Sequence, residues 1–270
     1  MAKQKFSMGN SLMILACVFV GILIYMFVLG NPLNFEHSDE ISFFRFPGGE
    51  HPIQGNLMGI MYKGGFIVPL LLAVNLIVFA FSIERTITLK KVSGTGNVKD
   101  FVQNIRNYIS NGQVNEAITE CDKQKGSIAN VIRTGLSELQ RVEKDSSKDK
   151  EEKIAAIQKG LEEATSLELP MMSRNLVILS TCASISVLIG LIGTVMGMIT
   201  AFSAMAQAGS PDTVALATGV SEALVNTLFG ILGSTLGIVF YNFFSSKVDA
   251  ITFAIDEAGY SIVQTFSTKH

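Results

Sequence analysis

The chain has 270 residues, of which 48% are hydrophobic and 16% charged, and its formal net charge at pH 7 is −2. Soluble domains carry about a quarter charged residues, so the composition argues against a soluble globular protein. The near-neutral charge gives no reason to expect a nucleic-acid partner. The three cysteines show no pairing pattern.

Charged residues are absent from stretches 6–35, 64–83 and 175–211, and stretch 213–246 contains only Glu222. Roughly 20 apolar residues are enough to cross a bilayer as a helix, and backbone groups in lipid must be satisfied within the segment. The sequence therefore predicts an all-α polytopic membrane protein with four transmembrane helices. Buried helices of a soluble bundle are the alternative, but four such runs argue against it.

Residues 1–30 are expected to form the first transmembrane helix. Lys3 and Lys5 precede its apolar core, as in a secretory signal, but the core is longer than is usual and no small-x-small cleavage site follows. Residues 31–63 are acid-rich and predict a periplasmic loop, and residues 64–83 predict the second span. Because basic residues mark the cytoplasmic side, Lys90 and Lys91 place the end of this span inside.

Residues 84–174 are expected to form a cytoplasmic helical region. Apolar residues recur at helical spacing near 98–109, 128–139 and 154–167. The charge-dense run 144–153 favours a solvated helix face or loop. The apolar repeat at 154–167, the third stripe, leads directly into the third span. We therefore expect the helix of the third span to begin inside the cytoplasm, with at most a kink at Pro170.

Residues 175–246 predict a two-helix hairpin in the membrane, followed by a cytoplasmic tail at 247–270. On a helical wheel the small residues of each helix gather on one face, which permits close helix packing. The residues expected to serve this packing are Gly190, Gly193, Gly197, Gly230, Gly233 and Gly237.

Polar residues share these faces. Thr194 and Thr227 lie about equally far from the turn near residue 209, which suggests a ring of hydroxyls when several copies surround an axis. Glu222 is an acid inside an apolar span, and such acids are functional by default. A protonated acid in a packing role, or a hydrated acid near the surface, remains the alternative for Glu222.

Two motifs carry a family resemblance. The first motif is Gly190-Leu191-Ile192-Gly193-Thr194-Val195-Met196-Gly197. The second is Ser221-Glu222-Ala223-Leu224-Val225-Asn226-Thr227-Leu228-Phe229-Gly230, and it is followed by Tyr241-Asn242. Both motifs resemble the ExbB/TolQ family, whose members are relatives of the flagellar stator subunit MotA. The resemblance covers roughly residues 64–250 and is closest to ExbB. The additional N-terminal span and Leu236, where the family often has proline, depart from the pattern.

The resemblance implies a five-fold ring around the single membrane helices of an ExbD-like partner, whose membrane aspartate carries the proton. It implies Thr194, Thr227, Glu222 and Asn226 as proton-pathway or pore-lining residues. It further implies a non-enzymatic motor subunit in a bacterial inner membrane. The basic residues Lys3 and Lys5 before the first span and Lys247 after the last predict that both termini are cytoplasmic. We expect no cofactor and no metal. The motor would energise TonB-dependent nutrient uptake through a TonB-like protein; a TolQ-type envelope motor or a MotA-like stator is the alternative.

Two other functional classes and a metal site are the remaining alternatives. A solute transporter predicts internal repeats, and none relates the first two spans to the last two. An intramembrane protease needs a nucleophile and base within the membrane, whereas all three histidines lie outside the spans. A metal site in the outer loop has suitable ligand types in loose spacing, at His37, Asp39, Glu40 and His51.

Overall fold

The computed structural model describes residues 8–36, 52–145, 147–206 and 213–269. Apart from one isolated bridge between Phe35 and Pro52, the regular structure of these residues is helical. The elements in chain order are α1 (Met8–Leu23), the π-helix η1 (Ile24–Leu29), the 3-10 helix η2 (Pro32–Asn34), α2 (Leu57–Tyr62), α3 (Ile67–Ser93), α4 (Val98–Ser110), α5 (Val114–Gln124), α6 (Gly126–Lys144), α7 (Lys150–Ser173), α8 (Leu176–Ala206) and α9 (Thr213–Lys269).

Four helical stretches of the described residues are long and apolar enough to cross a membrane. They are Gly9–Leu29, Ile67–Ser110, Lys150–Ala206 and Thr213–Thr268. This finding confirms the predicted all-α chain with four apolar spans. The ring expected for the assembled protein stays a prediction.

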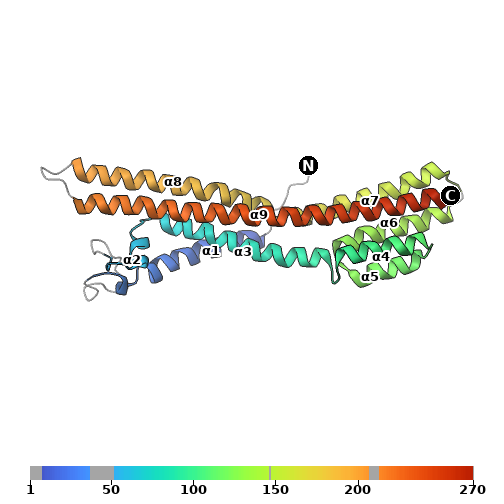
Figure 1. Cartoon of the computed structure of the whole chain (residues 1–270), viewed down its shortest axis with the longest axis horizontal. Helices are drawn as coiled ribbons and strands as arrows, with labels where there is room; N and C mark the ends of the chain where they lie inside the picture. Colours follow the sequence, from blue (N-terminus) through green and yellow to red (C-terminus); the bar gives the residue numbers. More distant parts are fainter. Residues whose placement is uncertain (1–7, 37–51, 146, 207–212, 270) are drawn as a thin grey trace. The chain divides into compact units, whose positions relative to one another are not determined.

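The chain divides into two compact units. The first contains α1, α2, the beginning of α3, nearly all of α8 and α9 as far as Tyr241. In this unit α8 and the first part of α9 run side by side (Figure 1). Many large apolar side chains on the outer faces of these two helices are exposed, among them Leu188 at 57% and Leu224 at 65%. Such a surface suits lipid or another protein chain rather than water.

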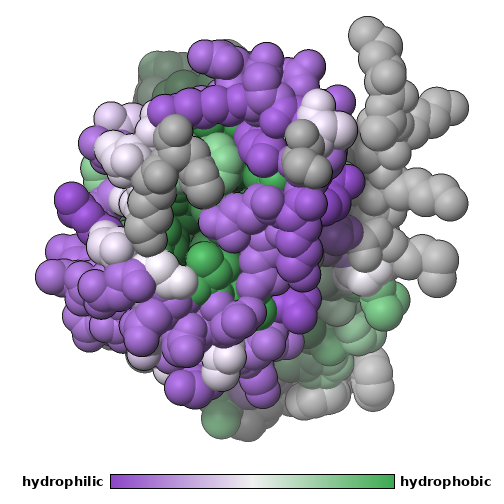
Figure 2. All heavy atoms as spheres, turned by 90° about the vertical axis from the view of Figure 1, so that its right-hand side faces the viewer, coloured by the Kyte–Doolittle hydropathy of each residue, from purple (hydrophilic) through white to green (hydrophobic). Residues whose placement is uncertain are grey.

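The second unit contains the end of α3, helices α4 to α7 and the last part of α9. Its core is formed by the apolar faces of α4, α6 and α7, with Ile105, Ile128, Ile132, Leu136 and Ile157 fully buried. The side of this unit shown in Figure 2 is largely hydrophilic, with hydrophobic atoms visible in a hollow near its middle. The predicted amphipathic helices are thereby confirmed, although Leu167 of the third stripe is 81% exposed.

The break between α6 and α7 lies within the charge-dense run 144–153. Helix α7 begins after Asp149, whose side chain accepts from the backbone N–H of Glu152, and the Glu152 carboxylate in turn accepts from the backbone N–H of Asp149. This reciprocal capping fixes the first turn of the helix.

The helix leading into the third span is interrupted at Asn175, so the expected continuous helix with a kink at Pro170 is wrong. Helix α7 continues through Pro170 to Ser173, and α8 begins at Leu176. Asn175 adopts φ of +65°, in the left-handed region that asparagine enters more readily than most residues. The backbone therefore turns at the asparagine rather than at the proline.

Candidate functional site

The buried faces of α8 and α9 in the first unit consist almost entirely of small residues. Both faces follow helical spacing, which brings the two backbones close together. The small or polar buried residues are Ala183, Ser186, Gly190, Gly193, Gly197 and Ala201 on α8, and Gly219, Ala223, Asn226, Gly230, Gly233 and Gly237 on α9. Leu179 and Val225 are the larger side chains that are also buried there.

The glycines on these faces have no room for a side chain. A Cβ atom on Gly190 would lie 3.0 Å from the Cα of Gly230, and one on Gly197 would lie 2.8 Å from the backbone N of Ala223. A Cβ atom on Gly237 would lie 2.8 Å from the Cβ of Ala183. Most of these neighbours are backbone atoms, which cannot move aside as a flexible side chain could.

Of the other three predicted packing glycines, Gly193 and Gly233 lie against polar side chains and Gly230 lies against backbone atoms. A Cβ atom on Gly193 would lie 2.5 Å from the Cβ of Asn226, and the equivalent atom on Gly233 would overlap the hydroxyl of Ser186. Gly230 faces the backbone of Gly190 and the carbonyl of Ser186. The structure therefore places all six glycines along the α8–α9 contact.

Thr194 and Thr227 meet at this contact, where their hydroxyl groups hydrogen-bond to each other. The Thr194 hydroxyl also lies 3.0 Å from the Gly190 carbonyl, and the Thr227 hydroxyl lies 3.1 Å from the Ala223 carbonyl. Each hydroxyl has one proton to donate and can accept as well. The pair can therefore exchange donor and acceptor roles, but neither group gains or loses a proton near neutral pH.

Both threonines are half-buried, so one edge of the pair is open. Thr194 borders a hollow of about 550 Å³ whose lining, among the residues that the structure describes, comes from α8 and includes Val195, Met198 and Phe202. A polar pair beside an apolar hollow can present a hydroxyl to another chain that packs there.

Glu222 lies on α9 beneath the turn that joins α2 to α3. Its carboxyl group sits against Gly65, where a Cβ atom would lie 3.2 Å from the carboxyl carbon. Gly65 has φ of +79°, so both its backbone conformation and the position of the acid favour glycine. The carboxyl group is only partly buried, and the turn covers one side of it.

Asn226 is fully buried within the first unit. Its side-chain amide donates a 3.0 Å hydrogen bond to the carbonyl of Gly64, whereas its Oδ1 atom has no partner among the described residues. Asn226 thus joins α9 to the α2–α3 turn. Its expected place on the proton pathway or pore lining of an assembled ring stays a prediction.

The sequence did not single out the stacked pair of Tyr25 and Tyr62, of which Tyr25 lies near Glu222. Their rings stack with centroids 4.6 Å apart, and the Tyr25 hydroxyl donates a 3.2 Å hydrogen bond to the Tyr62 carbonyl. Tyr25 lies within electrostatic range of Glu222. No periodicity or spacing signals this cluster, because its members are far apart in the chain.

Asn75 was also missed, although the sequence contained a signal for it. Its side-chain amide donates to the carbonyls of Leu71 at 2.8 Å and Phe229 at 3.3 Å, and so links α3 to α9. Asn75 interrupts an otherwise apolar span, and a polar side chain there needs a partner. The proposed ligands of the loop metal site, His37, Asp39, Glu40 and His51, lie outside the described residues.

Comparison with known proteins gives one family match. The model of the MotA/TolQ/ExbB proton channel family matches residues 123–257, which is half of the chain and includes α8 and the part of α9 that packs against it. Among curated proteins, the chain is 23% identical over 195 residues to an ExbB homolog of Methanothermobacter thermautotrophicus, covering 72% of this chain and 65% of the relative.

Two further relatives carry different names. The chain is 26% identical over 124 residues to the Tol-Pal system protein TolQ of Pseudomonas aeruginosa, covering 46% of this chain and 54% of the relative. It is 24% identical over 226 residues to the biopolymer transport protein ExbB of Pseudomonas putida, covering 80% of this chain and 68% of the relative. The chain therefore spans less than two thirds of the first two relatives.

Proposed function

The chain belongs to the MotA/TolQ/ExbB proton channel family, and we propose that it is the ExbB-type subunit of a proton-driven motor. As a member of that family it is a membrane transport component and not an enzyme. The proposed motor uses the proton gradient of a bacterial inner membrane to energise TonB-dependent uptake through the outer membrane. Moving one charge through 100 mV releases about 2.3 kcal/mol, so a few protons can drive one conformational step.

The observation that carries this proposal is the Thr194–Thr227 hydrogen bond at the centre of the small-residue contact. In the proposed motor the open edge of this pair faces the membrane helix of an ExbD-like partner. The partner's aspartate carries the proton, and the hydroxyls offer it hydrogen bonds without charge. Glu222 modulates the pathway, and the buried Asn226 holds the α2–α3 turn against α9.

The proposed assembly is a ring of five copies around the partner helices, set in the lipid bilayer with a TonB-like protein as the recipient of the movement. In this proposal both termini lie in the cytoplasm and residues 31–63 lie in the periplasm. The exposed apolar faces of α8 and α9 support such a ring, because they need lipid or protein to cover them.

Co-purification tests the proposal. The full chain, expressed with a single-span partner that bears a membrane aspartate, should elute as one complex in mild detergent. Proteoliposomes containing the complex should conduct protons, whereas replacing the partner's aspartate by asparagine should stop the flux. Recovery of the chain as a clean monomer in the presence of the partner would argue strongly against the motor.

A TolQ-type envelope motor is the second candidate, favoured by the similarity to TolQ of Pseudomonas aeruginosa; a MotA-like stator is a third. Complementation separates the first two. Rescue of iron-limited growth in a strain lacking ExbB supports the proposed role. Rescue of detergent resistance in a strain lacking TolQ supports the envelope motor.

A further inference from the structure

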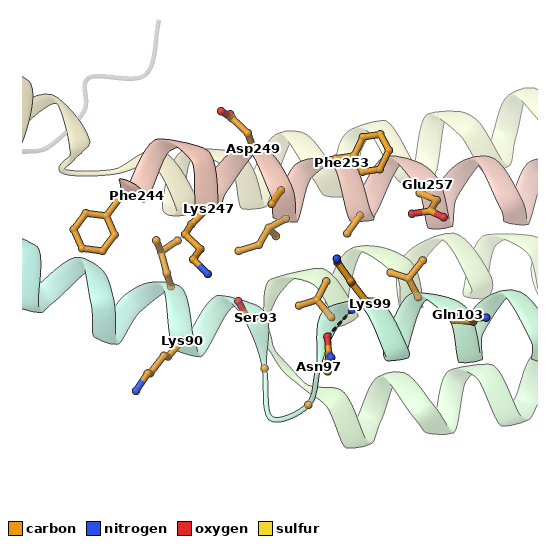
Figure 3. A pocket seen from close by; sticks show the side chains of 18 of the residues that line it. Lys90, Ser93, Asn97, Lys99, Gln103, Phe244, Lys247, Asp249, Phe253 and Glu257 are labelled. Carbon is orange, nitrogen blue, oxygen red and sulfur yellow. Dashed lines mark hydrogen bonds between the residues drawn. The ribbon is translucent and has the colours of Figure 1, made fainter. Parts of the chain in front are cut away.

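A large cavity lies within the second unit, away from the threonine pair. It has a volume of about 1580 Å³ and is bounded by the end of α3, the first turns of α4 and the last part of α9 (Figure 3). The proposed motor assigns it no role. Its position follows from the chain turn at residues 94–97, which directs α4 along α9 and leaves the space between them open.

Two lysines point into this cavity from opposite walls. Lys99 reaches into it from α4 and Lys247 from α9, whereas Asp249 points away (Figure 3). Among the described residues neither lysine belongs to an ion pair, although Lys247 lies 5.7 Å from the centre of the Phe243 ring. Two ammonium groups that face one cavity repel each other unless an anion lies between them.

Much of the wall around the lysines is apolar. Leu89 and Phe244 line the cavity and are buried, at 7% and 3% exposure. Phe243 also lines it and is 54% exposed, whereas the ring of Phe253, which is 69% exposed, points away from the lysines (Figure 3). An occupant therefore needs a negative group for the lysines and a hydrocarbon part for the phenylalanines.

The cavity begins where two apolar runs end. Along α3, the uncharged stretch ends at Ile83 and Lys90 follows two turns later. Along α9, the apolar run ends at Ser246, next to Lys247. Lysines and aromatic rings at the ends of spans lie at the level of lipid headgroups. Glu257, an acid on the lining, lies ten residues beyond Lys247, about 15 Å farther along the helix.

We propose that this cavity binds an anionic phospholipid, with its phosphate between Lys99 and Lys247 and an acyl chain along Phe243 and Phe244. Basic pockets between membrane helices are suited to anionic headgroups. An acidic peptide could meet the lysines, but the apolar wall beside them favours a hydrocarbon chain, which the surrounding leaflet always supplies. The bound lipid fills the space between α4 and α9 and stabilises their packing.

Native mass spectrometry of the full chain tests this binding. Protein purified from nanodiscs with equal amounts of phosphatidylglycerol and phosphatidylcholine should retain phosphatidylglycerol preferentially. Each lysine near anionic lipid contributes about 1 kcal/mol, so Lys99→Gln with Lys247→Gln should reduce retention by more than about tenfold. Lys99→Arg with Lys247→Arg keeps both charges and should retain the lipid.

The matched control removes the same charge elsewhere in the second unit. Lys144→Gln with Lys159→Gln replaces two exposed lysines that do not line the cavity and should leave retention unchanged. Equal retention of the two lipids by the unmodified chain, or equal loss in the control variant, would overturn the proposal. Protection by inorganic phosphate alone, measured as thermal stability in detergent, would assign the site to a free anion; capture of an acidic peptide instead of lipid would assign it to a protein.

Discussion

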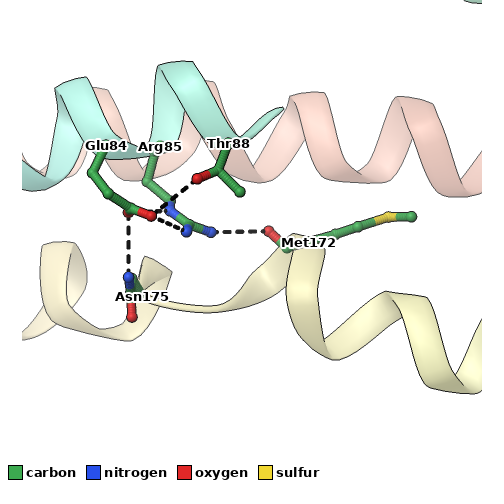
Figure 4. Close-up of polar contacts among 5 residues, drawn as sticks. All are labelled: Glu84, Arg85, Thr88, Met172 and Asn175. Atoms are coloured by element: carbon green, nitrogen blue, oxygen red, sulfur yellow. Dashed lines mark hydrogen bonds and ion pairs between the residues drawn. The ribbon is translucent and has the colours of Figure 1, made fainter. Parts of the chain in front are cut away.

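The side-chain amide of Asn175 donates a 3.2 Å hydrogen bond to the carboxylate of Glu84 (Figure 4). The same carboxylate accepts from Arg85 at 2.6 Å and from Thr88 at 3.0 Å, and Arg85 also reaches the carbonyl of Met172. Arg85 is only 1% exposed. This network fastens the end of the second apolar span to the chain turn between α7 and α8.

Asn175→Val should destabilise the protein by about 1–2 kcal/mol, because a β-branched residue is strained at φ of +65°, with a further loss from the missing hydrogen bond. Asn175→Gly removes the same hydrogen bond but accepts the backbone conformation, and should cost less. Thermal unfolding in detergent, followed by circular dichroism, measures both variants. Equal losses would show that backbone conformation contributes little at this turn.

The Glu84 network should also make stability depend on pH. Burial alone raises the pKa of Glu84, but hydrogen bonds from Arg85 and Asn175 outweigh it and lower the pKa below its ordinary value. The stabilisation is therefore complete above the unfolded pKa of about 4.3 and is lost as the pH falls through the folded pKa. Glu84→Gln should flatten the fall in unfolding temperature between about pH 5 and 3.

The control for this measurement is Glu162→Gln, which removes an exposed acid from α7. Its unfolding temperature should fall with acid as that of the unmodified chain does. An unchanged acid profile in Glu84→Gln would contradict the role of the network in stability.

Much of this fold follows from local pattern, and the exceptions have physical causes. Charge-free runs predicted four apolar spans because lipid excludes charge, and small-residue faces indicated how α8 and α9 meet. The sequence predicts a continuous helix with at most a kink at Pro170 and gives no sign of the break at Asn175, because sequence shows which residue lacks an N–H but not which residue adopts a left-handed conformation. The approach of Tyr25 to Glu222 depends on tertiary packing across almost 200 residues, for which one sequence has no signal.

Gly190→Leu should destabilise the first unit by roughly 1–3 kcal/mol or more, as overpacking does. A side chain at this position meets the backbone of Gly230, which cannot move without separating α8 from α9. Leu188→Phe enlarges a side chain on the outward face of the same helix, where Leu188 is 57% exposed. The control should unfold near the temperature of the unmodified chain, and equal loss in both would argue against close packing at Gly190.

Glu222→Gln should impair proton-driven uptake by about tenfold or more, if charge on this side chain stabilises a step of proton transfer by 1.4 kcal/mol or more. Glutamine has nearly the same shape, so assembly and thermal stability should change little. The measurement is uptake driven by an imposed proton gradient, together with the yield of the partner complex. Full activity would assign Glu222 to packing beneath the α2–α3 turn.

Thr194→Val combined with Thr227→Val should abolish proton-driven uptake while the complex still assembles. Valine keeps the branched shape of threonine, and replacing both members leaves neither hydroxyl without its partner. The variant therefore removes the polar edge of the α8–α9 contact with little change in packing.

The matched control is Thr200→Val with Thr218→Val, which removes two exposed hydroxyls from the same helices. These hydroxyls donate only within their own helices, to the carbonyls of Met196 at 3.1 Å and Val214 at 2.9 Å. The control should therefore retain uptake and proton flux. Because the two double variants lose the same number of hydroxyls, a difference between them assigns function to the paired position. Normal uptake in the Thr194–Thr227 variant would exclude these hydroxyls from the proton pathway.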